Sequence, residues 1–129
     1  MKVKWYSKEE LKAIPLLKEK TVRLVLININ KTYKTSPNYY SSVTHSWSVD
    51  PRFANQADYI LCELQGVVRE VFRMDAKKFQ PDAKHVGPRK RYFFNGSVVD
   101  SSDIRSRYIG HRIIKKRGES NPIHYINIK

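Results

Sequence analysis

The chain has 129 residues, which predicts one domain whose core is large enough to be stable without metals or disulfides. Its 25 Lys and Arg against 12 Asp and Glu give a net charge of +13, which excludes a nucleic-acid mimic and favours a polyanionic partner. The longest apolar run is far shorter than the ~20 residues of a membrane-spanning helix, and residues 1–6 contain no apolar signal segment.

We therefore expect no membrane contact. The single cysteine, Cys62, has no partner for an internal disulfide and falls in an apolar stretch. It is interpreted as a buried core residue of a cytoplasmic protein, because lone apolar thiols are typical of reducing compartments.

The first 20 residues indicate a helical extension that precedes a β-rich core over residues 21–129 of the same single domain. Ser7-Lys8-Glu9-Glu10 has the pattern of a capping box, and the helix that it opens is expected to end before Pro15. Residues 21–29 are rich in β-branched side chains, which predicts a mostly buried strand.

Aromatic residues recur at a helical spacing before the most apolar part of the chain. Tyr40, Val43 and Trp47 are three and four residues apart, which predicts a helix with an aromatic face over residues 38–47. Asp50-Pro51 then has the pattern of a helix cap followed by a first helical residue, so a second, short helix is expected there.

Residues 59–74 are the most apolar part of the sequence, and they predict a β-hairpin that turns at Gln65-Gly66. Its strands are rich in Val, Ile, Leu and Phe on both faces, so the hairpin is expected to be central to the core. A binding site is expected to lie against this hairpin, because the rest of the chain offers little rigid support.

The second half of the chain contains further strands and one helix. Residues 75–88 indicate a loop rich in Lys, Asp and Pro, and residues 91–99 are expected to form a strand. A helix over residues 104–109 is expected to end at Gly110, and residues 122–128 alternate as a final strand. This order predicts an α+β fold with a curved, mostly antiparallel sheet or a small β-barrel, and short helices at its rim.

Several short motifs resemble those of a known family. They are Ile-Asn-Ile-Asn-Lys-Thr-Tyr (27–33), Trp-Ser-Val-Asp-Pro-Arg (47–52), Gly-Val-Val-Arg-Glu-Val-Phe (66–72), Arg-Tyr-Phe-Phe-Asn-Gly (91–96) and Arg-Gly-Glu-Ser-Asn-Pro-Ile-His-Tyr-Ile-Asn (117–127). Together they resemble a functionally uncharacterised family of small bacterial and phage proteins, which implies no activity. The strand plan is also similar to PUA-like domains of the ASCH and EVE type. That similarity implies a small barrel that binds RNA or a modified base in an aromatic-lined pocket.

Aromatic and basic residues alternate along the chain, which favours binding of nucleic acid. Aromatic rings stack on unpaired bases, and Lys and Arg neutralise phosphates. We expect a base to insert beside Trp47, with cations at the rim of the pocket. The expected nucleic-acid-binding residues are Trp47, Tyr40, Lys34, Arg69, Arg91, Tyr108, Arg112, Lys115, Lys116 and Arg117.

Alternative functions stay open at this stage. His45, His111 and His124 have no metal-ligand spacing, but two histidines brought together by the fold would suit a metal-independent ribonuclease. Asp50 or Asp58 with Glu63 would suit a metal-dependent nuclease, although no metal and no cofactor is expected. A third alternative is a protein that inhibits a phage or host protein partner. The choice between DNA and RNA and the oligomeric state are left undecided.

Overall fold

The computed structural model describes residues 1–114 and 121–129. Within them, five strands form one sheet in the order β6-β3-β2-β1-β7. The strands are β1 (Leu24–Asn28), β2 (Tyr59–Leu64), β3 (Val67–Met74), β6 (Gly96–Val98) and β7 (Ile123–Ile126). β1 and β2 run parallel, and the other three pairings are antiparallel. The predicted α+β class and mostly antiparallel sheet are confirmed, whereas the alternative of a barrel is wrong, because the sheet of the described residues stays open.

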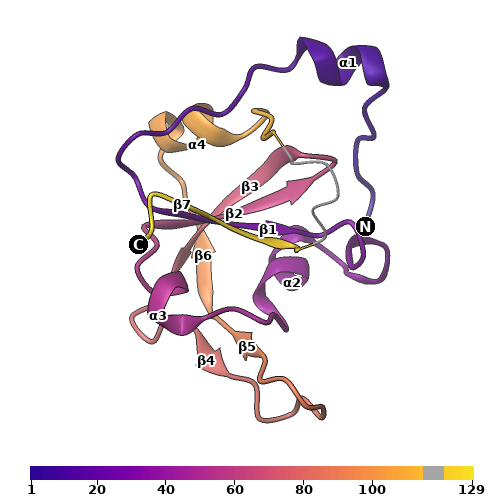
Figure 1. The fold of residues 1–129 in the computed structure, drawn as a ribbon. Helices are drawn as coiled ribbons and strands as arrows, with labels where there is room; N and C mark the ends of the chain where they lie inside the picture. The colour runs from indigo at the N-terminus through magenta and orange to yellow at the C-terminus, as the bar shows by residue number, and fades with distance from the viewer. Residues whose placement is uncertain (115–120) are drawn as a thin grey trace.

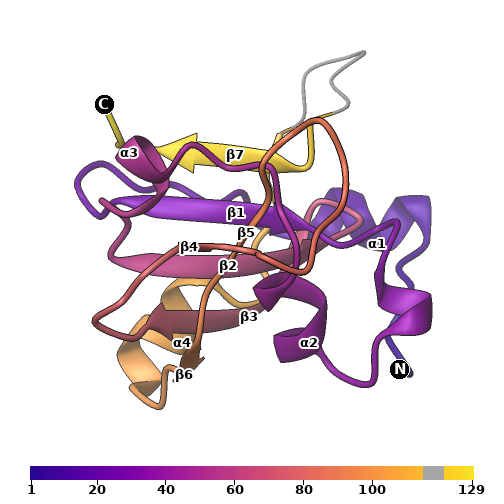
Figure 2. The ribbon, with the colours of Figure 1, turned by 90° about the horizontal axis from the view of Figure 1, so that it is seen from below.

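Both faces of the sheet are covered (Figure 1). α4 (Ser102–Tyr108) lies over one face, while α2 (Tyr39–Thr44) and α3 (Pro51–Ala54) lie over the other. A small second sheet, β4 (Gln80–Pro81) with β5 (Tyr92–Phe93), lies on the same side as α2 (Figure 2). We call β4, β5 and the loop between them, residues 80–93, the arm.

The two remaining helical segments lie outside the sheet layers. α1 (Lys8–Ala13) buries no side chain, and η1 (Tyr33–Thr35) is one turn of 3-10 helix. Every helix in the described residues is too short or too polar to cross a membrane.

The two faces of the sheet bury two separate apolar clusters. The first cluster, which includes Val25, Ile60 and Phe72, packs against α2 and the arm. The second cluster, which includes Leu26 and Val71, packs against α4. Successive side chains of the central strands therefore point into one core and then into the other, instead of into a core and then into solvent.

The central hairpin forms as predicted. Gln65 and Gly66 both have positive φ, 58° and 76°, which is the backbone of a type I′ turn and matches the twist of the two strands. Cys62 is fully buried in β2, and burial raises the pKa of its thiol, so it is a core residue as expected and not a nucleophile. The hairpin has a structural role, because its apolar side chains are buried in the two cores.

Local signals also behave as predicted at the helix ends. Ser7 and Glu10 form the capping box, and the Asp50 side chain accepts from the amide of Arg52 at 3.0 Å. Gly110 follows α4 with a φ of 79°, the left-handed conformation that ends many helices.

Three predicted elements differ from the structure, and the loop expected over residues 75–88 is one of them, because it contains β4. The helix expected over residues 38–47 ends at Thr44, so Trp47 lies beyond it in an extended segment. The strand expected over residues 91–99 is divided into β5 and β6. At Gly96 the backbone passes so close to Arg73 that an added Cβ would overlap the carbonyl oxygen there.

This close approach gives a stability prediction. Gly96→Ala is expected to lower the free energy of unfolding by about 2–3 kcal/mol, because the overlapping atom is backbone and cannot move aside. Gly87→Ala is the control, since its Cβ would meet only the movable ring of His85, and a change of about 0.5 kcal/mol or less is expected. Urea unfolding followed by tryptophan fluorescence measures both. Equal stability of the two variants would contradict the placement of β6 against β3.

Candidate nucleic-acid interface

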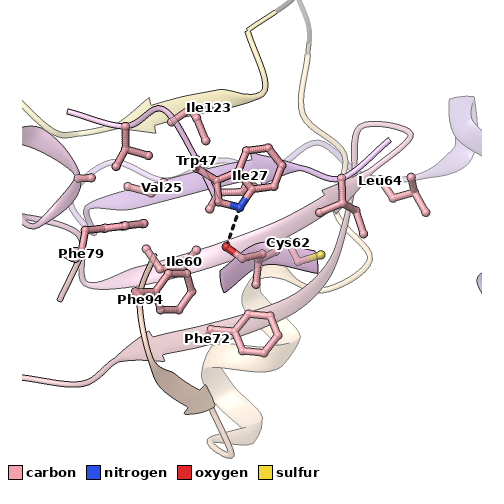
Figure 3. Close-up of a cluster of buried hydrophobic side chains, with 14 residues drawn as sticks. Val25, Ile27, Trp47, Ile60, Cys62, Leu64, Phe72, Phe79, Phe94 and Ile123 are labelled. Atoms are coloured by element: carbon pink, nitrogen blue, oxygen red, sulfur yellow. Dashed lines mark hydrogen bonds between the residues drawn. The ribbon is translucent and has the colours of Figure 1, made fainter. Parts of the chain in front are cut away.

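Trp47 belongs to the core, not to an open pocket, which corrects its predicted role. Only 6% of its surface is exposed, and its ring lies among the side chains of the first cluster (Figure 3). Its Nε1 donates to the carbonyl oxygen of Val43 at 2.9 Å. Because α2 stops at Thr44, the chain folds back and carries the ring beneath the helix. A base has no access to this ring.

Tyr108 is corrected for the same reason. It lies at the C-terminal end of α4 with 0% of its surface exposed, and its hydroxyl donates to the carboxylate of Glu19. Burial, followed by the bond to Glu19, raises the pKa of Tyr108. It ties residue 19 of the N-terminal segment to the second cluster and offers no face for stacking.

Tyr40 and the predicted arginines are largely engaged within the protein. Tyr40 accepts from the amide of Gly96 at 3.1 Å, and its ring packs on Phe72. Arg69 donates to the carbonyls of Leu64 and Lys4 at distances between 2.6 and 3.3 Å. These bonds engage both side chains within the fold, Tyr40 through its hydroxyl and ring and Arg69 through its guanidinium.

The remaining predicted cations divide into three cases. Arg91 donates to the carbonyl of Ser46 at 2.9 Å, and Arg112 is half-buried with its backbone bonded to Pro15 and Leu17. Lys34 is exposed, as a phosphate contact requires. Lys115, Lys116 and Arg117 lie outside the described residues.

The three histidines of the ribonuclease alternative lie in three different places. His45 follows α2 on the side of the sheet that carries the arm. His111 follows α4, with Nδ1 3.3 Å from the carbonyl of Ile109. His124 lies in β7 beside Ile123, and since Ile123 faces the first cluster, alternation turns His124 to the opposite face of the sheet. His45 and His124 are thus separated by the sheet.

The three carboxylates of the metal-dependent alternative are all bonded to other groups of the protein. Asp50 pairs with Arg52 at 2.8 Å, and Asp58 pairs with Arg23 at 3.1 Å. Glu63 is fully buried and accepts from Asn28 and from the amide of Gly66. Over residues 1–114 and 121–129, no three His, Cys, Asp or Glu side chains are grouped so that they could hold a metal ion.

The arm and the end of α2 enclose a groove of about 410 Å³ that we call the His45 groove. It is lined by His45, Pro81, Asp82, Ala83, Lys84 and Phe93. The rings of His45 and Phe93 stack in parallel, with centroids 5.6 Å apart and an angle of 5° between their planes. His45 is exposed and Phe93 half-exposed, so the pair forms an open aromatic wall.

The backbone fixes this wall in place. Trp47 donates to the carbonyl of Tyr92 at 2.9 Å and accepts from its amide at 2.8 Å, which joins the arm to the body of the domain. The backbone amide of Phe94, two residues after Tyr92, donates to the carbonyl of Thr44 at 3.2 Å, and the Phe94 side chain is fully buried. Phe93 points the other way, because successive residues of an extended chain face opposite sides.

The arm and the turn before it are strongly basic. Residues 77–91 contain six Lys or Arg and one acidic residue, Asp82. Lys84 lines the groove, and Arg89 and Lys90 are exposed on the loop of the arm. The Ser46 hydroxyl and the Lys84 amide, together with the charges of His45 and His85, hold the pKa of Asp82 below its ordinary value. The groove therefore combines an aromatic wall, exposed cations and one ionised carboxylate.

A second exposed aromatic stack joins the N-terminal segment to η1, which precedes α2 in the chain. Trp5 is 57% exposed, and its ring stacks on Tyr33 with centroids 6.1 Å apart. The segment that carries it is anchored by Gln65, whose side chain accepts from the Tyr6 amide at 2.8 Å and donates to its carbonyl at 3.0 Å. Lys34, beside Tyr33 in η1, is exposed next to this stack. We call Trp5 and Tyr33 the N-terminal platform.

Sequence reasoning missed Phe93, Asp82 and Trp5. The period-two alternation of Tyr-Phe-Phe predicts that Phe93 and Phe94 face opposite sides, and that signal was available. Trp5 continues the apolar alternation of Met1 and Val3, so its position in the sequence gives no signal for an exposed ring. Nothing local in the sequence places Asp82 beside His45, because 37 residues separate them in the chain.

Comparisons of the chain with family models, with curated proteins and with solved structures find no match. The groove and the platform are therefore interpreted from their own chemistry.

The two tryptophans give a direct test of this arrangement. In Trp5→Phe only the buried Trp47 remains, so its emission is expected at short wavelength and acrylamide is expected to quench it weakly. In Trp47→Phe only the exposed Trp5 remains, and quenching is expected to be several-fold stronger. Stern–Volmer titration of the two variants measures the difference. Strong quenching of Trp47 would restore it as a pocket residue.

Proposed function

We propose that this protein binds single-stranded nucleic acid, with one base in the His45 groove and the adjoining phosphates on the lysines of the arm. The observation that carries the proposal is the parallel His45–Phe93 stack beside the exposed Lys84. A groove of about 410 Å³ is within the size range of small-ligand sites, which begins near 300 Å³. An aromatic wall with cations at its rim is the arrangement that single-strand binding requires.

The charges and the aromatic wall contribute in different ways. Each phosphate neutralised on a single strand adds about 0.7 to the slope of log affinity against log salt. Stacking of a base adds about 1–3 kcal/mol and depends little on salt. The net charge of +13 supports the first term, and the accessibility of Phe93 supports the second.

The N-terminal platform supports a second contact with the same strand. α2 has six residues, so its ends are about 9 Å apart at 1.5 Å per residue. The platform precedes this helix and His45 follows it directly. We propose that a strand longer than a dinucleotide reaches both aromatic sites.

We also propose a cytoplasmic location. Of the PUA-like resemblance, the proposal retains only the expected ligand. A single buried thiol is suited to a reducing compartment. RNA or a modified base in an aromatic-lined site is what that resemblance implied, although the aromatic residues proposed here are different ones.

Substitution of the groove wall tests the proposal. Phe93→Ala is expected to raise the Kd for a labelled eight-nucleotide RNA or DNA strand by about 5- to 150-fold, through loss of stacking. Phe53→Ala is the matched control, because Phe53 on α3 is also exposed, at 38%, but lies outside the groove. Fluorescence anisotropy at several salt concentrations measures both. Absence of binding in the wild-type protein, or affinity that does not change with salt, would rule the proposal out.

The platform has its own prediction. Trp5→Ala is expected to raise the Kd for the eight-nucleotide strand by about 5-fold or more while leaving the Kd for a dinucleotide unchanged. The reason is that a dinucleotide is too short to span α2 from the groove. Anisotropy competition with unlabelled dinucleotide provides the comparison. Equal loss for both ligands would show that Trp5 acts on the groove itself or on folding.

A further inference from the structure

Asp82 is the one acidic residue among the six cations of residues 77–91, and it lines the groove. A carboxylate in this position weakens the attraction of phosphates, so a groove that only collected polyanions would be better without it. Its presence calls for a ligand group that carries hydrogen-bond donors.

The carboxylate is held in a defined position. Its Oδ1 accepts from the amide of Lys84 at 3.1 Å, while its own amide donates to Arg91 at 2.8 Å across the neck of the loop. Since its pKa lies below the ordinary value, Asp82 is ionised at neutral pH and acts only as an acceptor. A carboxylate has about four lone-pair positions, so the Lys84 amide and the Ser46 hydroxyl together leave capacity for a ligand.

We propose that Asp82 recognises the Watson–Crick edge of guanine, a step that rests on the proposed binding of single strands. Guanine presents two adjacent donors, N1–H and the 2-amino group, that match the two oxygens of a carboxylate. Adenine and cytosine present one donor beside an acceptor, and uracil presents one donor between two acceptors. An acceptor-only group thus forms two bonds with guanine and at most one with the others.

The other groove residues agree with this assignment. A base stacked on the His45–Phe93 wall has its edges free to form hydrogen bonds in the plane of the ring. Asp82 and Lys84 both line the groove that this wall borders. Lys84 is exposed at the same groove and supplies the positive charge that a phosphate of the nucleotide requires.

The experiment uses uridine hexamers with one central position changed to guanosine, inosine, adenosine or cytidine. Inosine is guanosine without the 2-amino group, so it removes one donor and leaves the stacking ring. We expect the guanosine strand to bind about 5- to 150-fold more tightly than the inosine strand, the discrimination typical of one bidentate contact. This comparison of RNA strands needs no protein variant, so its result does not depend on whether a variant folds.

Asp82→Asn is the protein-side test. In this variant the side-chain oxygen can still accept from the backbone amide of Lys84. The second carboxylate oxygen is replaced by an NH2 group, which donates, so the ratio of guanosine to inosine affinity is expected to fall to about one. Asp75→Asn is the matched control, because Asp75 caps the amide of Lys77 in the same way at 3.0 Å and lies outside the groove. Both variants lose one negative charge, so only the ratio separates them.

Each outcome is decisive. A wild-type ratio near one, or a guanosine preference that persists in Asp82→Asn, overturns the assignment while leaving single-strand binding intact. Failure of every hexamer to bind the wild-type protein overturns the proposed function and this inference together.

Discussion

The structure depends on the burial of Trp47 and on the two backbone hydrogen bonds that the same residue makes with Tyr92. The indole nitrogen of Trp47 donates a hydrogen bond to Val43 of α2. A buried tryptophan removes about 150–250 Å² of surface from water, which stabilises the folded state by about 4–6 kcal/mol at 25 cal/mol per Å². The backbone bonds join the arm to the body at the same point. His45 precedes Trp47 by two residues and Phe93 follows Tyr92, so the two rings of the groove meet because this register is fixed.

Much of the fold could be predicted from the sequence, because its strongest signals are local. The hairpin at Gln65-Gly66 and the cap at Asp50 each depend on neighbouring residues alone. The site could not be predicted in the same way. Trp47 has a helical spacing from Tyr40, but the helix ends at Thr44, and spacing carries no information about that end. The contact between His45 and Asp82 depends on how the arm docks, which is a tertiary property.

Counting charges does not separate the cations that are bonded within the fold from those that are exposed, for a reason that lies in the chemistry of the two cations. A guanidinium has five donors in a rigid plane, which suits it to backbone carbonyls and carboxylates within a fold. Arg69 and Arg91 are bonded to carbonyls, and Arg105 is paired with Glu70 at 2.6 Å. Lysine has a flexible stem and a strongly hydrated head, so Lys34 and Lys84 remain at the surface. The net charge of the chain thus overstates the charge available to a ligand, because several arginines are bonded within the fold, whereas Arg89, Lys84 and Lys90 of the arm are exposed.

The groove combines attraction and repulsion, and the balance between them bears on what it selects. Lysines attract any phosphate backbone equally, so they contribute affinity without sequence preference. In the proposed binding mode, the Asp82 carboxylate in the groove lowers that affinity for every strand, and a base recovers the loss only by bringing hydrogen-bond donors to the carboxylate. Specificity is a difference between affinities, and a repulsive group increases it when only one ligand can compensate. Under the proposed function, an acidic residue in a basic arm, which also caps the turn at Lys84, contributes to discrimination between bases and not to tighter binding of nucleic acid in general.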